Sequence, residues 1–245
     1  MATRLFFWRR EEEDAQSLEH HAKPGLLSDF ILGSQDGLVN VLGVILGVAV
    51  ASQELRIILA GGLAATFAES ISMGAVAYTS TLARRDHYLS ELEREKVEMV
   101  ELPDVEREEV RVVLQRWGFE GKELEDLTDK LISKPKAWLE FMMAHELNLA
   151  PVDKTQARKS AAVVGVAAIV GSVIPLIPFL VLRGSILTGI LVSMIVSAIT
   201  LFVIGWYKGK ATIGRPGRSG LQMLVIGIVA ALAGFGIAYL VGAPP

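Results

Sequence analysis

The chain contains no cysteine, and it contains no acidic residue after Asp153. Without cysteine there is neither a disulfide framework nor a thiolate ligand, so carboxylate, methionine, histidine and backbone oxygen remain as metal-binding groups. The roughly 90 residues after Asp153 are mostly Ala, Val, Ile, Leu and Gly. No short basic and apolar leader with a cleavage site opens the chain, so we expect no signal peptide. This segregation of charge excludes an ordinary soluble domain, and we expect no nucleic-acid partner.

Five stretches are long and apolar enough to cross a bilayer, because a spanning helix needs roughly 20 consecutive apolar residues. They cover about 30–52, 55–82, 160–182, 185–206 and 220–242. We therefore predict an all-α membrane protein with five transmembrane helices. A small helical domain is inserted between the second and third of them.

The basic residues predict which side of the membrane each loop faces. Of 24 Lys and Arg residues, 22 fall in the leader, in the segment after the second span, or between the fourth and fifth spans. The two opposite loops hold only Arg56 and Arg183. Because loops rich in Lys and Arg stay in the cytoplasm, we expect the N-terminus and the inserted segment there and the C-terminus outside. That arrangement requires an odd number of spans, and five satisfies it.

The segment 83–159 is predicted to form short helices, because its apolar residues make a broken stripe between charged faces. Pro103, Gly118 and Pro135 interrupt that stripe. We expect helices over about 85–101, 104–117 and 121–132, the first continuing out of the second span, and a fourth from about 135 that leads into the third span. The expected organisation is a cytoplasmic leader 1–28, spans 29–83, a cytoplasmic metal-binding domain 84–150, and spans 151–245.

Carboxylates and methionines gather in this segment at helical spacing. Two Glu-x-x-Glu pairs each lie on one helix face, and a Met-Met-x-x-Glu element follows 33 residues later. The residues concerned are Glu95, Glu98, Glu106, Glu109, Met142, Met143 and Glu146. Because three helices could aim these groups at one point, and thioethers favour softer ions over Mg²⁺ and Ca²⁺, the pattern indicates a transition-metal site. A solvated acidic face beside core methionines is the plainer interpretation, and it stays open.

Two spans contain carboxylates, which are costly inside a bilayer and normally face a partner, a cavity or an ion path. Asp36 lies one turn before Asn40 in the first span, and Glu69 shares a face with Met73 in the second. Close helix packing explains the glycines nearby. It does not explain Asp36 and Glu69, which we interpret as part of a transport path.

Residues 28–39 (SDFILGSQDGLV), 68–74 (AESISMG) and 78–80 (YTS) resemble paired signatures of the vacuolar iron transporter family. The resemblance covers nearly the whole chain from about residue 25. It implies a homodimeric exchanger that moves Fe²⁺ out of the cytoplasm against protons. It also implies that Asp36 and Met73 line the path, and that the Glu-x-x-Glu and Met-Met-x-x-Glu elements bind metal. One departure is Ala77, where many relatives are acidic; Glu69, two turns earlier, supplies a carboxylate.

We expect no enzyme and no prosthetic group, but Fe²⁺, Mn²⁺, Co²⁺ or Zn²⁺ as the bound and transported ion. Two other classes stay open. A membrane-anchored metal buffer or sensor needs neither Asp36 nor Glu69. A ferritin-like di-metal enzyme uses Glu-x-x-His motifs, whereas His145 directly precedes Glu146. The absence of a targeting signal fits a prokaryotic plasma membrane, which we favour, and also a vacuolar membrane.

Overall fold

The computed structural model describes residues 24–182, 185–212 and 214–242, and the regular structure in this part of the chain is helical, without strands. The expected leader 1–28 therefore lies largely outside the described residues. Contacts divide the chain into two compact units. The membrane unit comprises residues up to Met73 and from Val163 onward, and the inserted unit comprises Gly74–Ala162. Each unit is described by itself.

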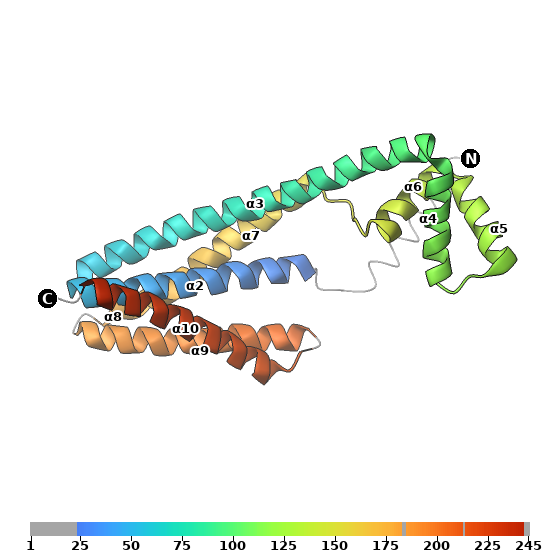
Figure 1. Ribbon diagram of the computed structural model, residues 1–245. Coiled ribbons are helices and arrows are strands. Elements are labelled where there is room, and N and C mark those ends of the chain that lie inside the picture. Colours follow the sequence, from blue (N-terminus) through green and yellow to red (C-terminus); the bar gives the residue numbers. More distant parts are fainter. Residues whose placement is uncertain (1–23, 183–184, 213, 243–245) are drawn as a thin grey trace, which may run out of the picture. The chain divides into compact units, whose positions relative to one another are not determined.

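Five helical segments among the described residues are long and apolar enough to cross a membrane, which confirms the predicted number of spans (Figure 1). They are α2 (Pro24–Ser52), α3 (Leu55–Glu101), α7 with α8 (Lys154–Val173 and Ile177–Val181), α9 (Ile186–Ala211) and α10 (Pro216–Gly242). Helix α3 has 47 residues. At 1.5 Å per residue it is about 70 Å long, more than twice the roughly 30 Å hydrocarbon core of a bilayer. The prediction that the second span continues into the inserted segment without a break is confirmed.

The third span is not one continuous helix over 160–182. Helix α7 ends at Val173, a 3₁₀ turn covers Ile174–Leu176, and α8 follows. Pro175 and Pro178 cause the break, because neither residue has a backbone N–H to donate within a helix. The Ser193 hydroxyl of α9 donates a hydrogen bond to the Pro175 carbonyl, 2.8 Å away. The irregular turn is thereby tied to the neighbouring span.

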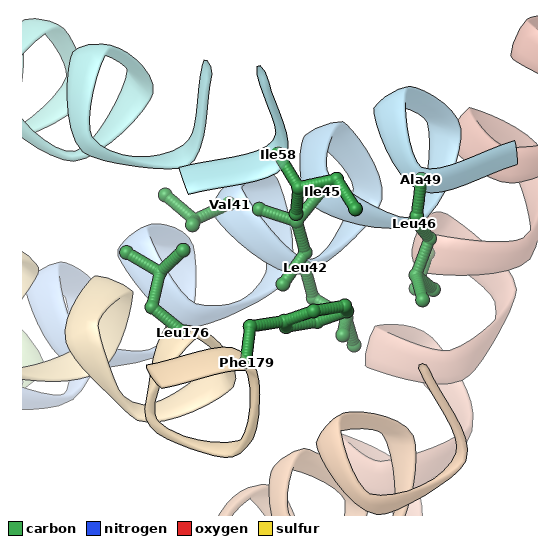
Figure 2. Packing of buried hydrophobic residues seen from close by; sticks show 9 residues of the cluster. Val41, Leu42, Ile45, Leu46, Ala49, Ile58, Leu176 and Phe179 are labelled. Carbon is green, nitrogen blue, oxygen red and sulfur yellow. The ribbon is translucent and has the colours of Figure 1, made fainter. Parts of the chain in front are cut away.

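The core of the membrane unit forms where α2 meets the broken third span (Figure 2). Apolar residues recur along α2 at three- and four-residue intervals, so they share one face. That face packs against Ile58 of α3 and against Leu176 and Phe179. The α2 members are Val41, Leu42, Ile45, Leu46 and Ala49.

Small residues let α2 and α7 approach closely. A side chain at Gly33 or Gly37 would overlap backbone atoms of α7, and one at Gly171 would overlap the backbone at Ser34. Close approach of this kind is what small residues provide between membrane helices. Packing therefore accounts for Gly33 and Gly37, as the sequence suggested.

The inserted unit contains three short helices, α4 (Pro103–Arg116), α5 (Gly121–Ile132) and α6 (Pro135–Phe141). They lie close to the predicted helices, because Pro103 and Pro135 each occupy a first helical position, where a missing N–H costs nothing. Positive φ angles at Gly118 and Gly121 form the turn between α4 and α5. The helices enclose a small apolar cluster made of Val110, Leu114, Leu124, Trp138 and Met142.

The fourth helix does not lead into the third span, so that prediction is wrong. After Phe141 the chain makes one π-helical turn, Met142–Glu146, and it is then non-helical until α7 begins at Lys154. Asn148, in this non-helical stretch, has a φ of 53°, which is not a right-handed helical angle. Asp153 then accepts a hydrogen bond from the Thr155 backbone N–H at 3.1 Å and so caps the start of α7.

Candidate metal centre

The carboxyl groups of Asp36 and Glu69 meet in the membrane unit. Asp36 comes from α2 and Glu69 from α3, both are half-buried, and their side chains lie within hydrogen-bonding reach of each other. The side chain of Asn40, one turn along α2, also lies near Glu69. We call Asp36 and Glu69 the membrane pair. Met73 lies one turn of α3 beyond Glu69 on the same face and is half-buried.

Two carboxyl groups at such short range can share one proton or bind one cation between them. Both lie on helices apolar enough to span a bilayer, where an unpaired carboxylate costs a few kcal/mol or more. A cation or a proton between them removes that cost. The membrane pair is therefore chemically suited to alternating occupation by a metal and by protons.

A second carboxylate pair lies in the inserted unit, where α3 meets α4. Glu95 and Glu106 are only 2% and 3% exposed, and their side chains are within hydrogen-bonding reach of each other. One oxygen of each, Glu95 Oε1 and Glu106 Oε2, is buried without a hydrogen-bond partner in the described part of the chain. A buried carboxylate oxygen without a donor is unfavourable, and a bound cation would satisfy it.

The surrounding acidic residues make this region strongly negative. Burial, then the hydrogen bond to Glu106, then the nearby acidic charges raise the pKa of Glu95 to about 8. Burial raises the pKa of Glu109 and of Glu146 as well, and the charge of Glu106 adds to both shifts. Glu98 acts on all three through its charge. These five glutamates, Glu95, Glu98, Glu106, Glu109 and Glu146, are called the acidic cluster.

The predicted methionines sit in the π-helical turn beside this cluster. Met142 and Met143 are both buried, at 0% and 2% exposure. The turn closes with a hydrogen bond from the Leu147 N–H to the Met142 carbonyl, five residues back. Such turns are frequent at functional sites. Met142 belongs to the apolar cluster, whereas Met143 does not, so Met143 is the better candidate for a thioether ligand.

No three Asp, Glu or His side chains of the described residues converge closely enough in this conformation to hold one ion by themselves. Like charges at short range repel, which keeps unneutralised carboxylates apart. The structure thus brings Glu95 and Glu106 into contact, and it places the other predicted glutamates within the range of their charges.

The ion pairs of Arg94 with Glu91 and Glu98 were not predicted from the sequence, although the spacing of these residues indicates them. Arg94 Nη2 lies 2.7 Å from a carboxylate oxygen of Glu91, and Arg94 Nε lies 3.4 Å from one of Glu98. Residues three and four apart face each other on a helix, so the pattern Glu-x-x-Arg-x-x-x-Glu predicts both pairs. A positive charge therefore lies directly at the acidic cluster.

Comparison with known proteins decides the family. The model described as "VIT family" matches residues 27–239. The chain is 35% identical to Vacuolar iron transporter 1 of Eucalyptus grandis, with 91% of this chain and 90% of the relative covered. It is 33% identical to Vacuolar iron transporter 1 of Arabidopsis thaliana, with 94% of each covered. The chain belongs to the VIT family. A more distant VIT relative, Vacuolar iron transporter of Plasmodium falciparum, is 28% identical over 230 residues.

The VIT family match takes in both candidate sites. Residues 27–239 include the membrane pair on α2 and α3 and the whole acidic cluster. Matches to the two plant proteins extend over nearly their full length, so the inserted unit lies within a chain of family-typical size. The resemblance carried by the span motifs is thereby confirmed as family membership.

Proposed function

We propose that this VIT family member moves Fe²⁺ out of the cytoplasm in exchange for protons, and that it also accepts Mn²⁺, Co²⁺ or Zn²⁺. The observation that carries the proposal is the contact between Asp36 and Glu69 on two span-length helices. The names of the relatives support iron as the cargo.

Exchange follows from the chemistry of the membrane pair. When the cation leaves, two carboxylates remain in a poorly solvated site and take up protons, because desolvation favours the neutral acid. When a new cation binds, the protons are released. Asn40 supplies a side-chain amide beside Glu69, and Met73 offers a thioether that favours borderline ions over Mg²⁺ and Ca²⁺. Antiport then requires no covalent step.

The acidic cluster binds the same ion in the cytoplasm before transport and so raises its local concentration. We call this role the collector. We place the inserted domain in the cytoplasm, with the N-terminus, because most basic residues lie on that side. The negative field of its many acidic residues raises the local cation concentration, and Met143 adds preference for transition metals. The relatives are named as vacuolar, and a prokaryotic plasma membrane would place the collector in the cytoplasm equally well.

A second copy of the chain is the partner that best fits an open groove in the membrane unit. The groove has a volume of about 500 Å³ and lies between α2 and α10. Small residues of α2, Gly43, Gly47 and Ala51, line it together with Asn40. Stripes of small residues mark helix–helix interfaces in membranes. A homodimer would bring two membrane pairs near one interface through Asn40.

Flux measurements on the purified full-length protein in liposomes test the proposed function. Under anaerobic conditions, Fe²⁺ uptake should be accompanied by proton movement in the opposite direction, and neither should depend on O₂. Asp36→Asn should abolish both fluxes while Fe²⁺ binding to the acidic cluster persists, because the amide keeps the shape but loses the charge and the exchangeable proton.

Each alternative function gives a different outcome. A membrane-anchored buffer or sensor would bind Fe²⁺ without any flux. A di-metal enzyme would consume O₂ and turn over Fe²⁺ without proton exchange. Wild-type flux in Asp36→Asn would show that the membrane pair is not on the path.

A further inference from the structure

The basic side chain of Arg94 lies at the acidic cluster. Its guanidinium group bridges two carboxylates of α3, with 2.7 Å to Glu91 and 3.4 Å to Glu98. The shorter contact is to Glu91, which does not belong to the acidic cluster. Arg94 therefore pairs more closely with Glu91 than with the cluster residue Glu98.

The charge of Arg94 also reaches the other two helical segments of the cluster. It lowers the pKa of Glu109 on α4 and of Glu146 in the π-helical turn, against the effect of burial on both. Lys96, two residues along the same helix, behaves differently, because it pairs with Glu93 at 3.1 Å and is not one of the main influences on the pKa of these glutamates. Position within the helix, and not charge alone, makes Arg94 a member of the site.

We propose that Arg94 is a tethered counter-ion, which pairs with Glu98 when no metal is bound and is displaced from it by the arriving cation. The inference rests on the proposed role of the acidic cluster in binding the transported metal. Arginine suits this role because it stays charged at every physiological pH and cannot itself ligate a cation. After displacement its guanidinium keeps Glu91 as a partner, so release from Glu98 costs little.

As a consequence, Arg94 limits the affinity of the acidic cluster for the metal ion. A cluster of five glutamates, in which Glu95 and Glu106 each bury one unpartnered oxygen, would otherwise bind a divalent ion tightly and release it slowly. Exposed ion pairs are worth up to about 1 kcal/mol, or about fivefold in a binding constant, and repulsion between Arg94 and a doubly charged ion adds to this. Removing the charge should tighten metal binding by about three- to tenfold.

Mn²⁺ binding to full-length protein in lipid nanodiscs tests the inference, with free Mn²⁺ measured by electron paramagnetic resonance at neutral pH. All variants carry Asp36→Asn, so that the membrane pair does not contribute. Arg94→Gln should lower the Kd by about three- to tenfold, whereas Arg94→Lys should stay within about twofold of the parent. Lys96→Gln is the matched control, because it removes the same charge from the same helix and should change the Kd by less than about twofold.

A double-mutant cycle separates occupation of Glu98 from a general charge effect. In a Glu98→Gln background, Arg94→Gln should lose most of its tightening effect, because there is no carboxylate left to free. Unchanged or weaker Mn²⁺ binding in Arg94→Gln overturns the inference, and so does equal tightening by Lys96→Gln. If Mn²⁺ binds but the Arg94 variants do not differ, the collector stands and the counter-ion role fails. If Mn²⁺ does not bind, or binds equally well without Glu95 and Glu106, both fail.

Discussion

Replacement of Glu95 by Gln is expected to stabilise the metal-free protein and to flatten the pH dependence of its unfolding. Glu95 is 2% exposed, and burial together with Glu106 raises its pKa from 4.5 to about 8. A carboxyl group whose pKa is raised by folding binds more protons in the folded than in the unfolded state between those two values. The free energy of unfolding therefore falls as the pH rises through this window. Gln keeps nearly the same shape and has no charge to bury.

The size of the effect follows from the two pKa values. Near pH 7 the medium lies about 2.5 units above the unfolded pKa, and at about 1.4 kcal/mol per unit Glu95 lowers the free energy of unfolding by about 3 kcal/mol. Above about pH 8 the loss approaches 5 kcal/mol. Glu93→Gln is the matched control, because Glu93 is on the same helix and its side chain is 74% exposed. It should change the free energy of unfolding by less than about 0.5 kcal/mol.

Urea unfolding from about pH 5 to about pH 9 measures this prediction, followed by the fluorescence of Trp117 and Trp138 in the inserted unit. Trp8 and Trp206 are first replaced by Phe, so that the signal comes from that unit alone. The reasoning is refuted if Glu95→Gln is no more stable than its parent near pH 8, or if the parent shows no loss of stability with rising pH. Added Mn²⁺ should stabilise the parent and release about one proton per bound ion, because the metal requires the ionised carboxylate.

Three further outcomes are expected. Met73→Leu should lower transport and shift competition from Fe²⁺ toward Mg²⁺, because Leu keeps the volume but lacks the sulfur donor; an unchanged selectivity ratio would exclude a thioether in the path. Met143→Leu should weaken Fe²⁺ binding several-fold in anaerobic equilibrium dialysis, whereas Met142→Leu should leave binding nearly unchanged, since Met142 packs in the apolar cluster; equal effects would contradict this assignment. Gly37→Ala should destabilise the protein by about 1–3 kcal/mol in thermal unfolding, because its Cβ would overlap the backbone of α7, while Gly236→Ala has open space and should be close to neutral; similar melting temperatures for both would contradict the packing.

The spans and the long second helix could be predicted from composition. A bilayer demands backbone hydrogen bonds within each spanning segment, so a sufficiently long apolar run has few alternatives to a helix. The stretch Leu55–Glu101 contains no proline, and it forms one helix although its second half is highly charged. Pro103 and Pro135 likewise predicted helix starts because their missing N–H groups restrict where they can stand.

The breaks near Pro175, Pro178 and Asn148 were not predicted. Hydropathy over 160–182 depends on how apolar each residue is, and it does not respond to a missing N–H. The Ser193 hydroxyl that hydrogen-bonds to the Pro175 carbonyl belongs to a different helix. The fourth inserted helix ends before Asn148, whose positive φ is a backbone feature that hydropathy does not report.

For the candidate sites, the sequence by itself determined which side chains share a helix face, because the 3.6-residue period fixes that locally. By spacing alone, the pair Glu95 and Glu98 is equivalent to the pair Glu106 and Glu109. Only the packing of α3 against α4 decided that Glu95 and Glu106 are the buried, unpartnered members. The contact between Asp36 and Glu69 was likewise decided by how α2 packs against α3. Spacing acts within one helix, whereas burial and the pairing of charges arise between helices, and only the tertiary structure brings helices together.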